Sequence, residues 1–284
     1  MIQPSTFSIV AYDPALQAWG IAVASKFPAV GAVVPWAKAD AGAIATQAHA
    51  NTSFGPTALD LMKQGHSAEQ AFNLLRLTDD GIEHRQVGLV DRLGGSFTFT
   101  GNQCFDWAGG IAGPGYAIQG NLLAGPQVVN KMEAAFTQSK ASFATRLVQA
   151  LKAGEDAGGD KRGKQSAAII VVKDKGGYSG FNDRMVDYRV DDAAEPVLRL
   201  IELLEYHELL FGKSSADEKL SINGQIKDGL DKVLRKQVSN YPSSTKDFRS
   251  ALNEFISREN FEDRCDLDTI DKPAYEYILG RFDQ

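Results

Sequence analysis

The chain has 284 residues and a net charge of −6 at neutral pH, which disfavours a nucleic-acid partner because phosphate binding needs a basic face. Its two cysteines, Cys104 and Cys265, cannot form a disulfide framework, and no apolar run approaches the roughly 20 residues that span a bilayer. No basic segment followed by an apolar segment marks the N-terminus for export, so we expect a cytoplasmic protein with no membrane partner.

The predicted fold begins with a set of antiparallel strands. Residues 6–12, TFSIVAY, alternate along a strand and place Thr6 and Ser8 on the same face. A turn follows, and residues 19–25 form the second strand of an expected hairpin. Two further apolar runs, 29–35 and 41–47, are also typical of strands. Because these strands follow one another directly, the pattern indicates an α+β protein and not repeated βαβ units.

Helices and further strands follow in the rest of the body. Ser67-Ala68-Glu69-Gln70 is a capping box, which predicts the start of a helix. Hydrophobic spacing predicts helices over 56–64, 127–136 and 142–153. Strands are expected over 85–90, 96–100, 167–172 and 185–190, with 107–118 as an edge strand or a loop.

The stretch 157–166, AGGDKRGKQS, comes close to a phosphate-binding loop, since it spells G-x-x-x-x-G-K from Gly158. In such a loop a strand precedes the glycines and a helix follows them, but here the predicted order is reversed. Gln165 also stands where a Ser or Thr would bind magnesium. The four histidines show no metal-ligand spacing. We therefore interpret the stretch as a polar loop and expect no nucleotide, metal or other cofactor.

Seven segments that occur in one order carry a family resemblance: TFSIVAYDP, WGIAVASKFPAVGAVVPWA, GAIATQAHANTSFGPTALDLM, EHRQVGLVD, YAIQGNLLAGPQVV, AGGDKRGKQSAAIIVV and DRMVDYRVDD. Together, over residues 6–192, they resemble the family called domain of unknown function 1028, which is classed with the N-terminal-nucleophile (Ntn) hydrolase-like folds. The resemblance implies a four-layer αββα sandwich of two antiparallel sheets within a domain of residues 1–212. Residues 213–284 resemble a small all-helical module named a peptidoglycan-binding domain, which implies a cell-wall fragment as its ligand.

The same resemblance implies a nucleophile at the start of the first strand. In Ntn hydrolases the first residue of the mature chain attacks an amide carbonyl, and its free α-amine accepts the proton. That amine has a pKa of about 7.7–8.0, close to working pH. Thr6 occupies this position, but Met1 to Ser5 precede it, so the chain must be cleaved between Ser5 and Thr6. Alternatively, Thr6 is a strand residue chosen for its β-propensity alone.

Further site residues are implied by the resemblance or by their positions near Thr6. Ser25 and Lys26 end the second strand, and a lysine there would lower the pKa of the nucleophile. Asp160 and Ser166 flank the turn into the strand after 157–166 and are expected to support the α-amine. The candidate substrate-binding residues are Ser8, Gln47, Asn51, His84, Gln119, Asn121 and Arg162.

Each of these residues also has a plainer interpretation. Lys26 and His84 are equally typical of solvated surface positions, and Asn51 is typical of a helix N-cap. Asp160 and Arg162 would then form no more than an internal salt bridge of a polar loop.

The tail of the chain is predicted to be helical. Hydrophobic stripes run over 197–204, 222–234 and 248–256, and residues 239–244 are the clearest turn between them. Such stripes more often form a core than a binding surface. The pattern therefore fits a packing or dimerisation module as well as a ligand-binding one.

Three functional hypotheses follow from these patterns. The first is an Ntn-type amidohydrolase that cleaves a small-molecule amide or a short peptide, with Thr6 as nucleophile. The second is a non-catalytic Ntn-like scaffold that binds a small ligand or a cell-wall fragment. The third is a structural homo-oligomer, and we expect self-association in any case because exposed sheet edges must be covered.

Overall fold

A computed structural model describes residues 6–212 and 214–283 of the chain. The chain divides into two compact units, Met1–Leu204 and Glu205–Gln284, which we call the body and the C-terminal module. The boundary expected from the sequence, after residue 212, lies at the end of helix α5 (Pro196–Phe211), which crosses this division. Among the described residues, no helix is both long enough and apolar enough to cross a membrane.

The body contains two antiparallel sheets. The larger sheet has the strand order β10-β9-β2-β1-β8-β7, so β1 lies in its interior. Its strands are β1 (Thr6–Asp13), β2 (Ala18–Ser25), β7 (Gly109–Gly113), β8 (Tyr116–Asn121), β9 (Ser166–Lys173) and β10 (Arg184–Val190). The smaller sheet pairs its strands in chain order: β3 (Pro35–Lys38), β4 (Gly42–Ala48), β5 (Arg85–Asp91) and β6 (Ser96–Thr100).

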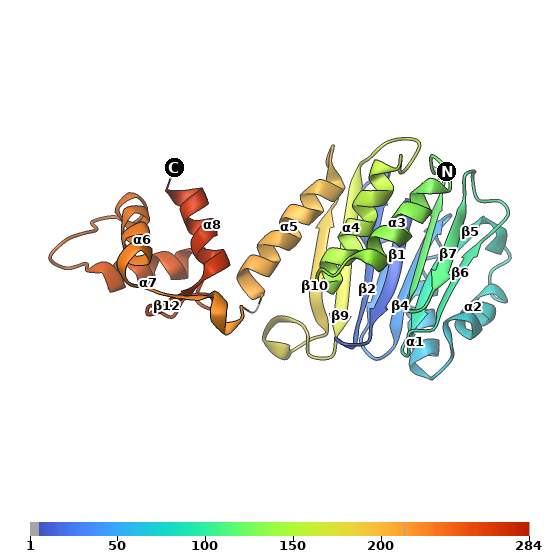
Figure 1. Cartoon of the computed structure of the whole chain (residues 1–284). Helices are drawn as coiled ribbons and strands as arrows, with labels where there is room; N and C mark the ends of the chain where they lie inside the picture. The colour runs from blue at the N-terminus through green and yellow to red at the C-terminus, as the bar shows by residue number, and fades with distance from the viewer. Residues whose placement is uncertain (1–5, 213, 284) are drawn as a thin grey trace. The chain divides into compact units, whose positions relative to one another are not determined.

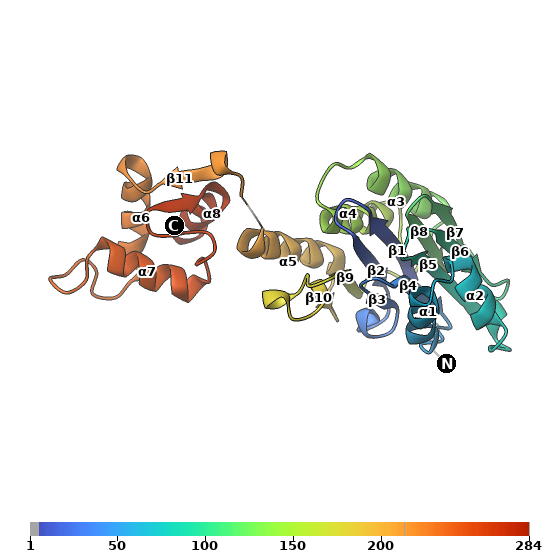
Figure 2. The ribbon, with the colours of Figure 1, turned by 90° about the horizontal axis from the view of Figure 1, so that it is seen from below.

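Three hydrophobic clusters order the body into four layers. One cluster lies between the sheets and joins Val10 and Val23 of the larger sheet to Ala43 and Ala45 of the smaller. The other two lie outside. Helices α3 (Gln127–Gln138) and α4 (Phe143–Asp156) cover the larger sheet, whereas α1 (Phe54–Lys63) and α2 (Ala68–Arg76) cover the smaller one (Figures 1 and 2). The predicted four-layer αββα sandwich of antiparallel sheets is confirmed.

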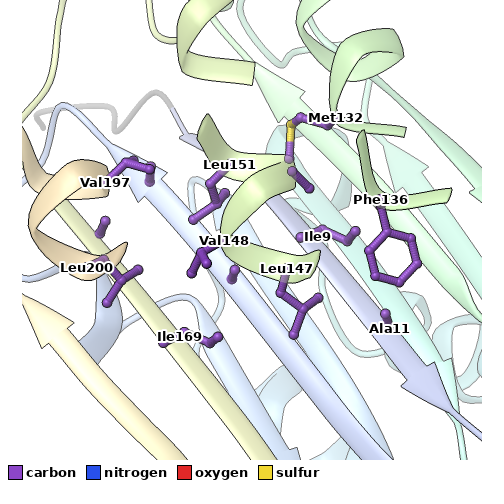
Figure 3. Packing of buried hydrophobic residues seen from close by; sticks show 14 of the residues in the cluster. Ile9, Ala11, Met132, Phe136, Leu147, Val148, Leu151, Ile169, Val197 and Leu200 are labelled. Carbon is purple, nitrogen blue, oxygen red and sulfur yellow. The ribbon is translucent and has the colours of Figure 1, made fainter. Parts of the chain in front are cut away.

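The alternation of side chains along β1 lets one strand serve two layers. Ile9 and Ala11 point into the cluster beneath α3 and α4, whose apolar side chains surround them (Figure 3). Val10 points the opposite way, into the cluster between the sheets. Thr6 and Ser8 share the face of Val10, as predicted, so their side chains point toward the smaller sheet.

Two segments of the body differ from the sequence prediction. Residues 29–35 are not a strand, because Val30–Ala32 form a 3-10 turn and β3 begins only at Pro35. Ala29 has a left-handed backbone with φ 51°, and its N–H donates to the Asp191 carbonyl, which turns the chain there. The glycine-rich segment 107–118 contains the edge strand β7 and the start of β8. The other predicted elements are present with slightly shifted ends, and the capping box begins α2 as expected.

The C-terminal module has a core of its own. Helices α6 (Gly224–Gln237), α7 (Phe248–Glu259) and α8 (Lys272–Phe282) enclose an apolar cluster that includes Leu234, Phe255 and Ile278. The module is not all-helical as predicted, because β11 (Lys219–Ser221) pairs with β12 (Thr269–Asp271). Strands of three residues are too short to produce a recognisable alternation of side chains, which explains the omission.

Candidate functional site

Thr6 begins β1 inside the larger sheet. Its backbone pairs with Ser25, the last residue of β2, and with Asn121, the last residue of β8. The Thr6 side chain is fully buried, and its Oγ1 lies 3.2 Å from Ser25 Oγ, within hydrogen-bond distance. The fold therefore brings together two of the predicted site residues, Thr6 and Ser25, at the ends of adjacent strands.

A network of buried amides connects the start of β1 to the smaller sheet. Ser8 Oγ donates to Gln47 Oε1 (2.6 Å) and accepts from Gln119 Nε2 (2.6 Å). Gln47 Nε2 donates to the Thr6 carbonyl (3.2 Å) and to Gln86 Oε1 (2.8 Å). All of these side chains are 0 % exposed. Side-chain amides therefore fasten β1 to β4 and β5.

Gln86 is the residue of this amide network that sequence reasoning missed. Its Oε1 also accepts from Asn121 Nδ2 (3.0 Å), and its Nε2 donates to Thr100 Oγ1 and to the Gly120 carbonyl, both at 2.8 Å. The signal in the sequence was a glutamine on the face of β5 that also carries Val90, which packs between the sheets. A buried amide on an apolar face requires hydrogen-bond partners from elsewhere in the fold.

The burial of the amide network bears on three predicted substrate-binding residues. The side chains of Ser8, Gln47 and Gln119 lie between the sheets and are bonded to one another. In this arrangement they hold the two sheets together beneath Thr6. Direct contact with a substrate stays a prediction for each of them.

The loop 157–166 closes over the end of β2. The Asp160 carboxylate accepts from the Lys26 N–H (2.7 Å) and pairs with Arg162, whose Nη2 lies 3.2 Å from Asp160 Oδ2. The same Arg162 nitrogen donates to the Lys26 carbonyl (3.1 Å). The Asp160 side chain is 1 % exposed, so its ion pair with Arg162 lies inside the loop. This is the internal salt bridge of the plainer interpretation. The carboxylate thereby fixes the backbone directly after Ser25.

Ser166 holds the turn that follows β2. It pairs with Ser25 across the sheet, and its Oγ accepts from the Val30 N–H (3.1 Å) and donates to the Phe27 carbonyl. The exposed Lys26 side chain points to the same loop, where its Nζ donates to the Lys164 carbonyl (3.2 Å). An effect of Lys26 on the pKa of Thr6 stays a prediction.

His84 lies beside a second histidine that the sequence did not single out. The rings of His49 and His84 have centroids 5.6 Å apart, and with Asn121 and Cys104 they line a pocket of about 10 Å³. Burial lowers the pKa of His49 and so favours the neutral form of this ring. Within the described parts of the chain, no group of three or more His, Cys, Asp or Glu side chains is placed to hold a metal ion.

Asn51 belongs to a polar cluster near His49. Its Nδ2 donates to Asp79 Oδ2 (2.8 Å), and Arg85 Nε donates to the same oxygen (2.9 Å). The hydrogen bond from Arg85 lowers the pKa of Asp79 to about 2. Asn51 Oδ1 accepts from the N–H of Ser53, the residue before α1, so Asn51 fixes the turn into this helix without capping it.

A family model and a solved structure match this chain. The model described as "Family of unknown function (DUF1028)" matches residues 6–200, and this match begins at Thr6. The crystal structure of protein SPO2555 from Silicibacter pomeroyi, described by the same family, is similar at 32 % identity and a TM-score of 0.66. The similarity covers 72 % of this chain and 89 % of that chain. No curated protein matches the chain.

Proposed function

The chain belongs to the DUF1028 family, whose function is unknown, and we propose that its body is an Ntn-type amidohydrolase with Thr6 as the nucleophile. The bond cleaved would be an amide in a small molecule or a short peptide. One observation carries this proposal: the Thr6 hydroxyl stands on the first residue of an interior strand, 3.2 Å from the hydroxyl of Ser25.

The proposed reaction begins when Thr6 Oγ1 attacks the carbonyl carbon of the substrate amide. Cleavage of the chain before Thr6 supplies a free α-amine, which takes the hydroxyl proton and delivers it to the leaving amine. The acyl group then remains on Thr6 as an ester, which water hydrolyses to a carboxylic acid and free Thr6. An intact peptide bond between Ser5 and Thr6 blocks this cycle, because an amide nitrogen is not a base at neutral pH.

The contacts around Thr6 support the proposal because they fix its position from two sides. Gln47 holds the Thr6 carbonyl from the smaller sheet, and Asp160 holds the backbone after Ser25. The Ser25 hydroxyl lies within hydrogen-bond distance of Thr6 Oγ1 and would orient it. Such support matters for catalysis, since a misplacement of about 1 Å can lower a rate by about 100-fold.

A different observation favours the non-catalytic scaffold. The Thr6 side chain is 0 % exposed, so a substrate carbonyl cannot reach its Oγ1 in this arrangement. Catalysis requires Thr6 to become accessible, whereas a scaffold that binds a ligand does not.

A set of variants distinguishes these two functions. In a shortened chain an initiator methionine directly precedes Thr6, and its removal leaves Thr6 as the first residue. We expect this chain to hydrolyse a member of a panel of amides, lactams and short peptides, with products identified by mass spectrometry. Thr6→Ala should abolish the hydrolysis and Thr6→Ser should retain part of it.

The control for this experiment is Thr46→Ala, which removes another buried strand hydroxyl, one that donates to the Asn51 carbonyl. This variant should hydrolyse the substrate at the parent rate. Equal hydrolysis by the Thr6→Ala chain and the parent would rule out Thr6 as nucleophile. A parent chain that hydrolyses nothing in the panel would favour the scaffold.

A further inference from the structure

A larger pocket lies on the helix-facing side of the larger sheet, at the C-terminal end of α4. It has a volume of about 90 Å³, roughly enough for several water molecules or a short aliphatic group. Its apolar walls include Phe7, Ala24 and Pro196. Glu155 and Lys164 supply charged groups to the same pocket. The glycine-rich loop 157–166 therefore covers a small cavity that is apolar on one side and charged on the other.

Glu155 is incompletely satisfied in this pocket. Its side chain is 5 % exposed, and its buried Oε1 accepts no well-directed hydrogen bond within the described residues. Lys164 Nζ lies 3.1 Å from this oxygen, but it also lies 2.5 Å from Glu195 Oε2. One ammonium group therefore serves two carboxylates, and Lys152, the other cation that acts on Glu155, forms its ion pair with Asp156.

The other acidic group of the pocket does not change this balance, because Asp160 is neutralised by Arg162. Burial also raises the pKa of Glu155 even though Lys164 acts in the opposite direction. A buried carboxylate is costly unless it is paired and fully hydrogen-bonded. A second cation that enters the pocket would complete the bonding of Oε1 and stabilise its ionised form.

We propose that this pocket binds the protonated amine of a small ligand, with Glu155 as its anionic partner and the apolar walls around its aliphatic part. A carboxylate gives an ammonium group a charge-assisted hydrogen bond, which is stronger than a neutral one. The apolar walls of Phe7, Ala24 and Pro196 favour an alkylammonium ion over a hydrated metal cation.

The amine pocket and the Thr6 hydroxyl lie on opposite faces of the larger sheet. Phe7 and Ala24 face the pocket from the helix-covered side of the sheet, whereas the Thr6 side chain points toward the smaller sheet. Binding requires only the folded body. The amine site and the role of Thr6 in hydrolysis can therefore be tested, and can fail, separately.

Ethylammonium chloride is a suitable probe for the full chain at pH 7, with the backbone amide NMR signals of residues 155–164 as the readout. We expect saturable shifts with ethylammonium, and none with potassium chloride at equal ionic strength or with neutral ethanol. Glu155→Gln should weaken binding about tenfold, because a buried hydrogen bond to a charged group is lost. Glu202→Gln makes the same charge change at an exposed carboxylate of α5 and should leave the affinity unchanged.

Lys164→Met provides the opposite perturbation, because it removes the ammonium group that competes for Glu155. We expect it to tighten ethylammonium binding by about tenfold, the lower end of what a hydrogen bond to a charged group contributes. This variant also keeps the test decisive if the Glu155→Gln chain does not fold. Shifts that do not saturate in the parent chain, or equal affinities of the parent and the Lys164→Met chain, would overturn the proposed site.

Discussion

Replacing Gln86 by leucine removes the centre of the buried amide network while it nearly preserves the size of the side chain. Gln86 is 0 % exposed and makes hydrogen bonds of 2.8 Å to Gln47, Thr100 and the Gly120 carbonyl. Each buried polar group left without a partner costs about 1–3 kcal/mol, and Gln47 keeps its bond to Thr6. We therefore expect Gln86→Leu to lower the free energy of unfolding of the body by about 3–5 kcal/mol.

Urea unfolding followed by tryptophan fluorescence measures this loss in the body alone, because Trp19, Trp36 and Trp107 all lie there. With a slope of about 2–3 kcal/mol per molar urea, the midpoint should fall by about 1–2.5 M. Gln149→Leu on the exposed side of α4 is the matched control and should change the stability by less than about 0.5 kcal/mol. Equal midpoints for the two variants would show that the amides do not form a closed, buried network.

Two more predictions concern contacts made by residues of β5. The pKa of Asp79 is lowered from 3.8 to about 2, so its ion pair with Arg85 stabilises the fold above pH 4 and is lost as the pH falls toward 2. Asp79→Asn should therefore lower the unfolding free energy by about 1–2 kcal/mol at pH 7, and by progressively less as the pH falls below 4. A loss at pH values below 4 as large as the loss at pH 7 would contradict this role of the ion pair. Gly88→Ala would place a Cβ atom 2.0 Å from Gln119 Oε1, so Gln119 must move. We expect this substitution to lower the free energy of unfolding by about 1–3 kcal/mol and with it the urea midpoint. An unchanged midpoint would contradict this close packing.

The order of helices and strands was predictable because it depends on local patterns. The alternation along β1 and the capping box at Ser67 both act over a few residues, and both are observed. Residues 29–35 misled the prediction because an apolar composition does not reveal the left-handed backbone of Ala29. The four-layer arrangement followed from the family resemblance alone, since periodicity does not show that Thr6 pairs with Asn121.

The candidate site was predictable only where its residues are close in sequence or belong to a recognisable motif. Thr6 and Ser25 meet because one hairpin joins their strands, and Asp160 pairs with Arg162 within one loop. Gln86 and His49 were missed because their partners come from distant strands. A sequence shows that a polar residue stands on an apolar face, but it does not show which amide from another strand will satisfy it.

Catalysis by Thr6 requires this residue to be the first of the mature chain, since only then does it have a free α-amine. The intact mass and the N-terminal sequence of the purified protein, fresh and after prolonged incubation, reveal whether this happens. We predict a species that begins at Thr6. A chain that always keeps Met1 to Ser5 would contradict the proposed hydrolase and leave the ligand-binding scaffold as the function to pursue.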